Sequence, residues 1–377
     1  MSFIYYILTF LVIINLIVFV HEYGHFSAAR RVGVKVLRFS IGVGPEIFGW
    51  TDKEGTRWSF CAILVGGYVM MLGDGDISST TQDTEALKKL SQEEQKKSAC
   101  AKSNWEQMWI AFCGPFFNYI YAFIVVVCMS FFYGVPTYEP VVSKLEDDSP
   151  ARNAGLLSGD RILSINDAKI RSFRDIPINV MKAADNEALK FTYERNGVID
   201  SVEITPEIRE TKTFFKTKKR KFVGIARGEP KFYKKGFIDS LVEGVKYCWN
   251  FTVEMCGMFK LLFSGKSSMD NFGGVVQMSK VAGDLSKAGS FAQLIMFTVM
   301  LSLNLGFINL LPLPVLDGGR IVICFVEEIS GKKLNEKFQE YLMMACAALL
   351  ILIMVATTAN DIMNLEIVNE FCSKVLG

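Results

Sequence analysis

Hydrophobic residues are concentrated in four long runs separated by polar sequence. The runs cover residues 4–20, 108–133, 291–316 and 341–359, and the third resumes after Asp317. Each is long enough to cross the hydrocarbon core of a bilayer, about 30 Å thick, as a helix. No basic residue precedes the first run, as a secretory signal peptide would require, so we expect a retained span. The pattern predicts a mainly α-helical polytopic membrane protein with four transmembrane helices.

Two segments between the first and second runs have a different character. Residues 57–72 are apolar and strand-like, are interrupted by Gly66-Gly67, and are too short to span a membrane as a helix. We interpret them as a re-entrant β-loop that packs against protein, because lipid cannot pair the backbone groups of an open strand. Residues 73–104 are polar and lack an apolar period, which predicts a mobile cytoplasmic loop.

The sequence between the second and third runs predicts one small α/β domain at 141–209. A strand at 160–166 and a helix at 173–183 precede two strands that are joined through Asn196-Gly197, a strong hairpin signal. The basic stretch 212–221 is interpreted as a solvated surface, with contact to lipid headgroups as the alternative. Residues 236–263 have the pattern of an amphipathic helix at a membrane surface.

These patterns divide the chain into four regions. They are an N-terminal membrane region at 1–140, the α/β domain at 141–209, a basic and amphipathic linker at 210–290, and a C-terminal membrane region at 291–377.

Composition agrees with a membrane protein that has one sizeable water-facing part. Of the 377 residues, 50% are hydrophobic and 21% are charged, and the net charge of +2 is too small to indicate nucleic-acid binding. The nine cysteines are scattered and none lies in a CxxC motif, so we interpret them as small buried side chains rather than disulfide or metal ligands.

Basic residues beside the runs predict the orientation in the membrane. By the positive-inside tendency, the two short connections face the cytoplasm, and both termini and the long segment 134–290 lie outside. The basic residues that support this orientation are Arg30, Arg31, Lys35 and Arg38 after the first run, and Lys332, Lys333 and Lys337 before the fourth.

Residues His21-Glu22-Tyr23-Gly24-His25 form an HExxH pattern, and they contain both histidines of the chain. On a helix, positions i and i+4 share one face, so both imidazoles can bind one metal ion. Zinc lowers the pKa of bound water from 15.7 to about 7, which lets Glu22 act as the base. Ionisable groups are costly at membrane depth, which also favours a metal site over helix packing.

A catalytic zinc ion requires three protein ligands and one open position, so a third ligand must lie elsewhere. No third histidine exists, and Asp317 is a lone carboxylate flanked by apolar sequence, which makes it the preferred candidate. Glu46, 21 residues after His25, is a weaker alternative because it follows Gly-Pro rather than a helical segment. Asp317 could instead cap a helix beside Gly318-Gly319.

The segment before Asp317 predicts a break in the third span. Pro312 and Pro314 cannot continue an ideal helix, and irregular backbone at membrane depth is tolerated where it lines a cavity within the protein. Asn304 and Asn309 can hydrogen-bond the main chain of a substrate or, equally, neighbouring helices.

Together these motifs resemble the site-2 protease family of intramembrane zinc metalloproteases, and in particular its bacterial regulator-of-sigma-E type. The HExxH pattern and the segment 309–319, NLLPLPVLDGG, carry the resemblance. Further similar segments are the glycine-rich turn at 39–45, the β-loop at 66–69, the second-span motif at 114–118, the PDZ signature at 155–160 and residues 270–274.

The resemblance implies an enzyme of the bacterial inner membrane. It would cleave transmembrane segments of single-span membrane proteins, with both termini and a single PDZ domain on the periplasmic side. Its partners would be these substrates, peptide tails at the PDZ domain and membrane lipids. Zinc would be bound by His21, His25 and Asp317, with Glu22 as the base. Substrate would contact Asn304, Asn309, Pro312, Pro314, Gly66 and Gly67.

Two other classes of function are compatible with parts of the pattern. A non-proteolytic membrane scaffold that binds tails through its PDZ domain would not need Glu22 or a carboxylate opposite the histidines. A transporter can also contain broken helices, but four spans without an inverted repeat argue against one.

Overall fold

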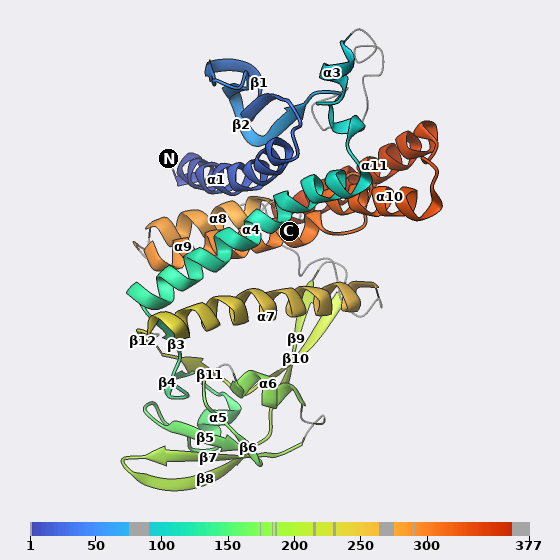
Figure 1. Ribbon diagram of the computed structural model, residues 1–377. Coiled ribbons are helices and arrows are strands. Elements are labelled where there is room, and N and C mark those ends of the chain that lie inside the picture. Colours follow the sequence, from blue (N-terminus) through green and yellow to red (C-terminus); the bar gives the residue numbers. More distant parts are fainter. Residues whose placement is uncertain are drawn as a thin grey trace. The chain divides into compact units, whose positions relative to one another are not determined.

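The computed structural model of the chain is mostly helical (Figure 1). It describes residues 2–74, 90–173, 175–182, 184, 187–213, 216–228, 231–263, 275–287, 289 and 291–363. The chain forms two compact units. The first consists of Met1–Val127 and Leu241–Gly377, and the second of Cys128–Ser240.

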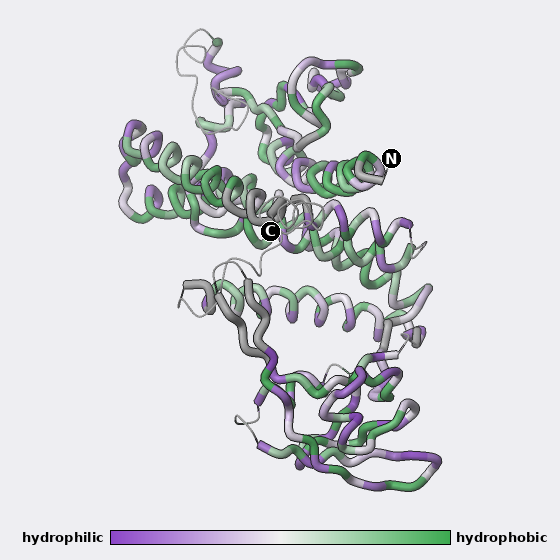
Figure 2. Tube along the Cα trace, turned by 180° about the vertical axis from the view of Figure 1, so that it is seen from behind, coloured by the Kyte–Doolittle hydropathy of each residue, from purple (hydrophilic) through white to green (hydrophobic). Residues whose placement is uncertain are grey.

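Four apolar helices in the first unit are long enough to span a membrane, as the sequence predicts. They are α1 (Ser2–Arg31), α4 (Asn104–Phe132), α9 (Phe291–Asn309) and α11 (Glu336–Met363). Hydrophobic residues prevail along them in Figure 2, whereas polar residues are frequent in the second unit. The four spans make the chain a multi-pass membrane protein.

Apolar side chains hold α1 and α4 against the C-terminal helices. Ile13 and Ile17 of α1 pack with Phe297 and Leu301 of α9, and helix α8 (Val275–Lys287) contributes Ala282 to the same cluster. In a second cluster, Ala122 and Val126 of α4 pack with Val299 and Leu303, on another side of α9. Helix α9 therefore lies at the centre of the packing.

The predicted break after the third span is present. Helix α9 ends at Asn309, residues 310–316 form turns, and α10 (Asp317–Ser330) begins at Asp317. Helix α10 ends at Gly331, whose φ of 65° is the left-handed conformation that glycine adopts most easily. The break places Asp317 at the first position of a new helix.

Strands β1 (Val36–Thr51) and β2 (Arg57–Met71) form a small folded sheet after α1. The first half of β1 pairs with both ends of β2, so that Phe39 lies opposite both Val69 and Trp58. Strand β1 bends at Gly42 and Gly44, and β2 bends at Gly66; all three glycines have positive φ. The glycine-rich turn expected near residue 42 is thus present.

Residues 57–72 do not form a hairpin by themselves, although their sequence suggests a self-contained loop. Their pairing partner is β1, and the turn between the strands lies at residues 52–56. The two halves of β2 flank the same segment of β1, which local sequence cannot reveal because strand pairing joins distant residues.

Residues 90–103 differ from the expectation of an unstructured loop. They contain the short helices α3 (Gln92–Gln95) and η1 (Ala99–Ala101). The Lys35 amide donates to the Lys97 carbonyl, and the Ala99 amide donates to the Leu72 carbonyl, which ties this segment to the small sheet. The rest of the predicted loop, residues 75–89, and the segment 270–274 lie outside the described residues.

The second unit is built around a four-stranded sheet in the order β6-β5-β7-β8. Asn196 and Gly197, with φ of 52° and 82°, form the predicted hairpin turn between β7 and β8. Further pairs are β4–β11, β9–β10 and β3–β12. The core includes Leu156, Ile162 and Phe191.

The strands of the second unit are β3 (Val135–Thr137), β4 (Val142–Leu145), β5 (Arg161–Ile165), β6 (Ala168–Lys169), β7 (Leu189–Arg195), β8 (Val198–Ile204), β9 (Glu207–Thr213), β10 (Lys216–Phe222), β11 (Ile225–Arg227) and β12 (Lys231–Tyr233). Its helices are α5 (Pro150–Asn153) and α6 (Asp175–Lys182). Helix α7 (Phe237–Phe263) matches the predicted amphipathic segment.

Candidate metal centre

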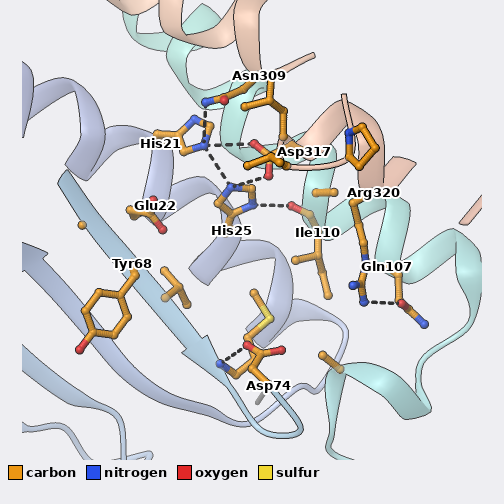
Figure 3. Close-up of a pocket in the computed structure, with 18 of the residues that line it drawn as sticks. His21, Glu22, His25, Tyr68, Asp74, Gln107, Ile110, Asn309, Asp317 and Arg320 are labelled. Atoms are coloured by element: carbon orange, nitrogen blue, oxygen red, sulfur yellow. Dashed lines mark hydrogen bonds and ion pairs between the residues drawn. The ribbon is translucent and has the colours of Figure 1, made fainter. Parts of the chain in front are cut away.

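The two histidines of α1 and Asp317 of α10 converge on one point (Figure 3). The Nε2 atoms of His21 and His25 are 3.2 Å apart. Asp317 Oδ2 lies 3.1 Å from His21 Nε2, and Asp317 Oδ1 lies 3.4 Å from His25 Nε2. Both histidines are buried. The two histidines and Asp317, which follows His25 by 292 residues, therefore present three potential ligand atoms within 4.8 Å of one another.

The chemistry of these groups fits a metal ion. The Nδ1 atom of His25 lies 2.8 Å from the Ile110 carbonyl oxygen, which can only accept, so Nδ1 carries the proton and Nε2 presents its lone pair. A carboxylate faces that lone pair, and such a concentration of acceptors is stabilised by a cation. Two imidazole nitrogens and one carboxylate are also the ligand set of catalytic zinc sites that keep one position open.

Asp317 is directed to the histidines by the tight turn before α10. A Cβ atom on Gly318 would lie 2.3 Å from the Leu310 carbonyl oxygen, and one on Gly319 would lie 2.1 Å from the Leu313 carbonyl oxygen. Only glycine fits at either position, because residues 310–316 fold back over the first turn of the helix. The N-cap position is occupied by Leu316 without a side-chain cap bond, so Asp317 does not serve as the N-cap residue.

Glu22 lies beside the histidines and is contacted by strand β2. The Val69 backbone hydrogen-bonds the Glu22 carboxylate. A Cβ atom on Gly67 would lie 2.8 Å from the Ser40 carbonyl oxygen and 3.5 Å from Glu22 Cγ. The absence of a side chain at Gly67 thus lets the backbone of the small sheet pass close to the carboxylate.

Helix α4 packs directly on the two imidazoles. A Cβ atom on Gly114 would lie 2.3 Å from His25 Nε2 and 3.0 Å from His21 Cε1. From the other helix, a Cβ atom on Gly24 would lie 2.3 Å from the Cys113 carbonyl oxygen. These two glycines allow α1 and α4 to approach closely at the level of the histidines.

A cavity of about 410 Å³ opens beside these groups. Gly66, Gly67, Asn309 and Pro314 line it together with the histidines, Glu22 and Asp317. Its wall also includes Gln107 and Arg320, which are joined by a hydrogen bond of 2.9 Å. The residues of the candidate metal centre therefore border an open space rather than a fully packed core.

Not every predicted contact residue lies at this cavity. Asn309 lines it, with Nδ2 at 3.4 Å from His21 Nε2, whereas Asn304 is half-buried in α9 and is absent from the lining. Five helical residues correspond to a rotation of about 140° beyond one full turn, so the two side chains leave α9 in different directions. Pro312 is exposed and does not line the cavity.

Glu46, the weaker candidate for the third ligand, has other partners. It forms an ion pair with Arg38 at 2.7 Å and another with Arg57. Among the described residues, the group of side chains that can share a metal ion contains Asp317 and not Glu46.

Three residues of α4 contact the histidines, and the sequence indicated two of them, Gly114 and Asn118, only as part of the second-span motif at 114–118, without a role. The three are Ile110, Gly114 and Asn118, and Asn118 Nδ2 lies 3.2 Å from His21 Nδ1. Their spacing of four is the same as that of the histidines, so they share one face of α4. That spacing was the available signal, but apolar residues surround it on every face of the helix.

Comparison with known proteins agrees with this geometry. The family model described as peptidase family M50 matches residues 9–353. A protein of Rhizobium meliloti is 32% identical, covering 95% of this chain and 96% of its own length, and one of Rickettsia conorii is 34% identical, covering 95% and 99%. A protein of Clostridium acetobutylicum is 32% identical, covering 92% and 94%. All three are named "Putative zinc metalloprotease".

The solved structures that match include one that aligns with part of the chain. It is the PDZ domain of the SdrC-like protein of Listeria monocytogenes, of which 90% aligns with 25% of this chain at 19% identity and a TM-score of 0.21. A similarity this low does not by itself establish a PDZ fold. The family match and the relatives, in contrast, extend over nearly the whole sequence, and we conclude that the chain belongs to peptidase family M50, the site-2 protease family, and is a multi-pass membrane zinc metalloprotease.

Proposed function

We propose that His21, His25 and Asp317 hold the zinc ion and that Glu22 is the general base. The enzyme then hydrolyses peptide bonds within transmembrane segments of single-span membrane proteins. The observation that carries this proposal is the convergence of three ligand atoms within 4.8 Å of one another. They lie beside Glu22, and two of them belong to α1, a helix that is apolar enough to span a membrane.

The residues around the cavity have distinct tasks in this mechanism. When bound, zinc supplies Lewis-acid chemistry that polarises a carbonyl group and lowers the pKa of water. Glu22 accepts the proton of the attacking water at its carboxylate and later delivers it to the leaving amine. Asn309 lies at the cavity wall, where its Nδ2 can donate to a carbonyl oxygen of the substrate main chain.

The substrate binds in an extended form along strand β2. A helical peptide bond is shielded by its own helix, so the transmembrane segment must unwind before hydrolysis. The Gly66-Gly67 backbone lines the cavity next to Glu22, and an extended segment can add to it as a further strand. Main-chain hydrogen bonds then bring the scissile bond to the metal with little demand on side-chain identity.

The small β1–β2 sheet is proposed to re-enter the membrane. Asn15 Nδ2 donates to the Leu64 carbonyl oxygen at 2.7 Å. Asn15 lies 15 residues before Arg30, which is about 22 Å along the helix axis. We call the end of the sheet that contacts Asn15 its tip. Near this tip Ile47 and Ile63 are 75% and 53% exposed, whereas the turn at 52–54, at the other end, is charged. An apolar tip and a charged turn suit lipid and water, respectively.

The remaining parts complete a periplasm-facing topology in a bacterial inner membrane. By the positive-inside tendency, the basic flanks favour a cytoplasmic location for the short connections, so we infer that residues 141–209 form a single PDZ domain that lies on the periplasmic side together with both termini. The four-stranded sheet, and the burial of Leu156 and Asp160 within the segment 155–160, support this assignment. Peptide tails bound by the domain, and membrane lipids, are the partners besides the substrate.

Replacing Glu22 with Gln tests the mechanism. The variant retains the shape of the side chain but loses the proton acceptor, so we expect it to bind zinc at the wild-type ratio and to lose cleavage by a factor of at least 10². The assay uses the full chain reconstituted in vesicles with a model single-span protein, and mass spectrometry locates the cut.

The control variant is Asp317→Ala, which should lose both zinc and cleavage. A Glu22→Gln enzyme that still cuts the transmembrane segment, or an Asp317→Ala enzyme that keeps its zinc, would contradict the assigned roles. A cut that falls only outside the membrane segment would contradict the proposed substrate class. A scaffold without proteolytic activity would produce no cut with any variant.

A further inference from the structure

The side chain of Asn118 is fully buried against the metal centre but has no task in the mechanism above. It lies one turn after Gly114 on α4, and its Nδ2 atom is 3.2 Å from His21 Nδ1. Its Oδ1 atom is also buried and has no hydrogen-bond partner among the described residues. The Ser302 hydroxyl of α9 donates to the Asn118 backbone carbonyl at 3.1 Å, which fixes the position of this turn.

If His21 is a metal ligand, its hydrogen bond with Asn118 must have a definite direction. If Nε2 gives its lone pair to the metal, the neutral imidazole must carry its proton on Nδ1. That proton needs an acceptor, and an amide nitrogen cannot accept. The nitrogen and oxygen of a carboxamide have nearly the same size, so a half-turn about the Cβ–Cγ bond exchanges them in place. In that orientation Oδ1 gains the Nδ1–H of His21 as its donor.

The other histidine already has such an arrangement. His25 Nδ1 donates at 2.8 Å to the carbonyl of Ile110, which lies on α4 as Asn118 does. Ile110 and Asn118 are two turns apart, with Gly114 midway between them, so one face of α4 offers an acceptor to each imidazole and makes room for both rings. The two contacts are equivalent in chemistry although one uses the main chain and the other a side chain.

We propose that Asn118 is a positioning residue that accepts the Nδ1 proton of His21 through Oδ1 and so directs the Nε2 lone pair toward the metal. The inference rests on the proposed function, because it requires His21 to be a ligand. Hydrogen-bond partners of this kind fix the ring orientation and raise ligand basicity, and their loss typically costs 10- to 100-fold in metal affinity. Asn118 thus strengthens metal binding without touching the metal.

The test compares two substitutions with opposite hydrogen-bonding chemistry. Asn118→Leu removes the acceptor at similar volume, whereas Asn118→Asp provides a side chain whose carboxylate only accepts. Zinc release from the purified full chain into a coloured chelator is expected to be roughly 10- to 100-fold faster for Asn118→Leu and no faster than wild type for Asn118→Asp. With cobalt in place of zinc, Asn118→Asp keeps the wild-type absorption spectrum and Asn118→Leu does not.

A merely structural role predicts a different result. If Nδ2 acted as a donor, Asn118→Asp would release zinc as fast as Asn118→Leu, and that outcome would overturn the proposal. Equal release rates for wild type and Asn118→Leu would also overturn it. Should Asn118→Leu fail to fold, the Asp substitution still decides, because rapid release from a folded Asn118→Asp protein contradicts an acceptor role.

Two controls separate this inference from general damage and from the proposed function. Thr298→Val removes another hydrogen bond between α9 and α4, the part-buried 2.7 Å contact with Tyr121, without touching the histidines, and should leave zinc release unchanged. Asp317→Ala should abolish zinc binding. If Asp317→Ala binds zinc normally, the proposed ligand set fails. If Asp317→Ala loses zinc but Asn118→Leu releases zinc at the wild-type rate, the ligand set stands and the proposed role of Asn118 fails.

Discussion

At the scale of single residues, the metal centre depends on the absence of a side chain at Gly114. A methyl group at this position would lie 2.3 Å from His25 Nε2, closer than any non-bonded contact allows, and the contacts of the ring with Ile110, His21 and Asp317 leave it little room to move aside. We therefore expect Gly114→Ala to displace the imidazole from the position in which it faces Asp317. Zinc content and cleavage should both fall at least tenfold, as measured by metal analysis and the vesicle assay.

Gly257 provides the matched control for that substitution. It also lies within a helix, α7, but a Cβ atom there would meet no heavy atom within 4 Å. Alanine is the better helix former, by about 0.5–1 kcal/mol, so Gly257→Ala should keep its zinc and be at least as stable as wild type. Equal zinc content in both variants would show that Gly114 is not a close neighbour of the histidines.

Asp160 is the buried charge on which the second unit depends. Its carboxylate accepts two hydrogen bonds from Arg195 and one from the Leu157 amide, each 2.7 Å long. Burial alone would raise the pKa of Asp160, but these hydrogen bonds outweigh it and hold the pKa below its ordinary value of 3.8. Since the folded-state pKa is lowered, the stabilisation is complete above about pH 4 and is lost as the pH falls further.

Hydrogen exchange of peptides from residues 128–240 in the full chain would measure this effect. Asp160→Asn should destabilise the unit by on the order of 2 kcal/mol at pH 6, or about 30-fold faster exchange, because it leaves Arg195 without its counter-charge. The difference between variant and wild type should shrink as the pH is lowered from 5 to 3. A difference that stays constant over this range would contradict the role of the ionised carboxylate.

At the scale of elements, sequence reasoning succeeds where the signal is local. The i, i+4 spacing of His21 and His25 and the prolines before Asp317 are readable because helix geometry and backbone restriction act over a few residues. The roles of Ile110 and Asn118 depend on which face of α4 meets α1, and in an almost uniformly apolar helix that face is marked only weakly, by the spacing of four and by the motif at 114–118. The pairing of β1 with both ends of β2 is likewise set by contacts between residues about 20 to 35 positions apart.

The turn of the small sheet offers a prediction at this scale. The Asp52 carboxylate accepts hydrogen bonds from Arg30, at the end of α1, and from Trp58 and the Thr56 amide in the sheet. Burial would raise the pKa of Asp52, but these partners hold it at about 2. Asp52→Ala should therefore loosen the sheet relative to α1 and speed amide exchange in peptides from residues 36–71 about tenfold.

Glu54→Ala is the matched control in the same turn. Glu54 also pairs with Arg30, at 3.3 Å, but its side chain is 69% exposed, and exposed ion pairs contribute about 0–1 kcal/mol. Exchange in this variant should stay within a factor of about three of wild type. If Glu54→Ala loosens the sheet as much as Asp52→Ala does, the net charge of the turn matters rather than the bonds made by Asp52.

At the scale of the whole molecule, the site requires a definite orientation in the membrane. Arg30 and Arg31 end α1 only five and six residues after His25, so the metal centre lies about 8 Å along the helix from the basic end of the span. By the positive-inside tendency we expect that end in the cytoplasm, and in this proposed topology α4 would return the chain to the other side of the membrane. Hydrolysis would accordingly occur nearer the cytoplasmic surface than the periplasmic one.

Insertion of a protease recognition sequence at two exposed turns tests this orientation. One insertion is placed at Asn196-Gly197 between β7 and β8, and the other beside Glu54 between β1 and β2. In sealed spheroplasts, protease added outside should cut the first variant and spare the second, whereas both should be cut after the membrane is permeabilised. The reverse pattern would invert the topology, and cutting of both variants in sealed spheroplasts would mean that the β1–β2 turn and the second unit share one side. Either result would move the proposed zinc site away from the cytoplasmic surface, because the HExxH motif and the β1–β2 turn are tied to the same end of α1 through Arg30 and Asp52.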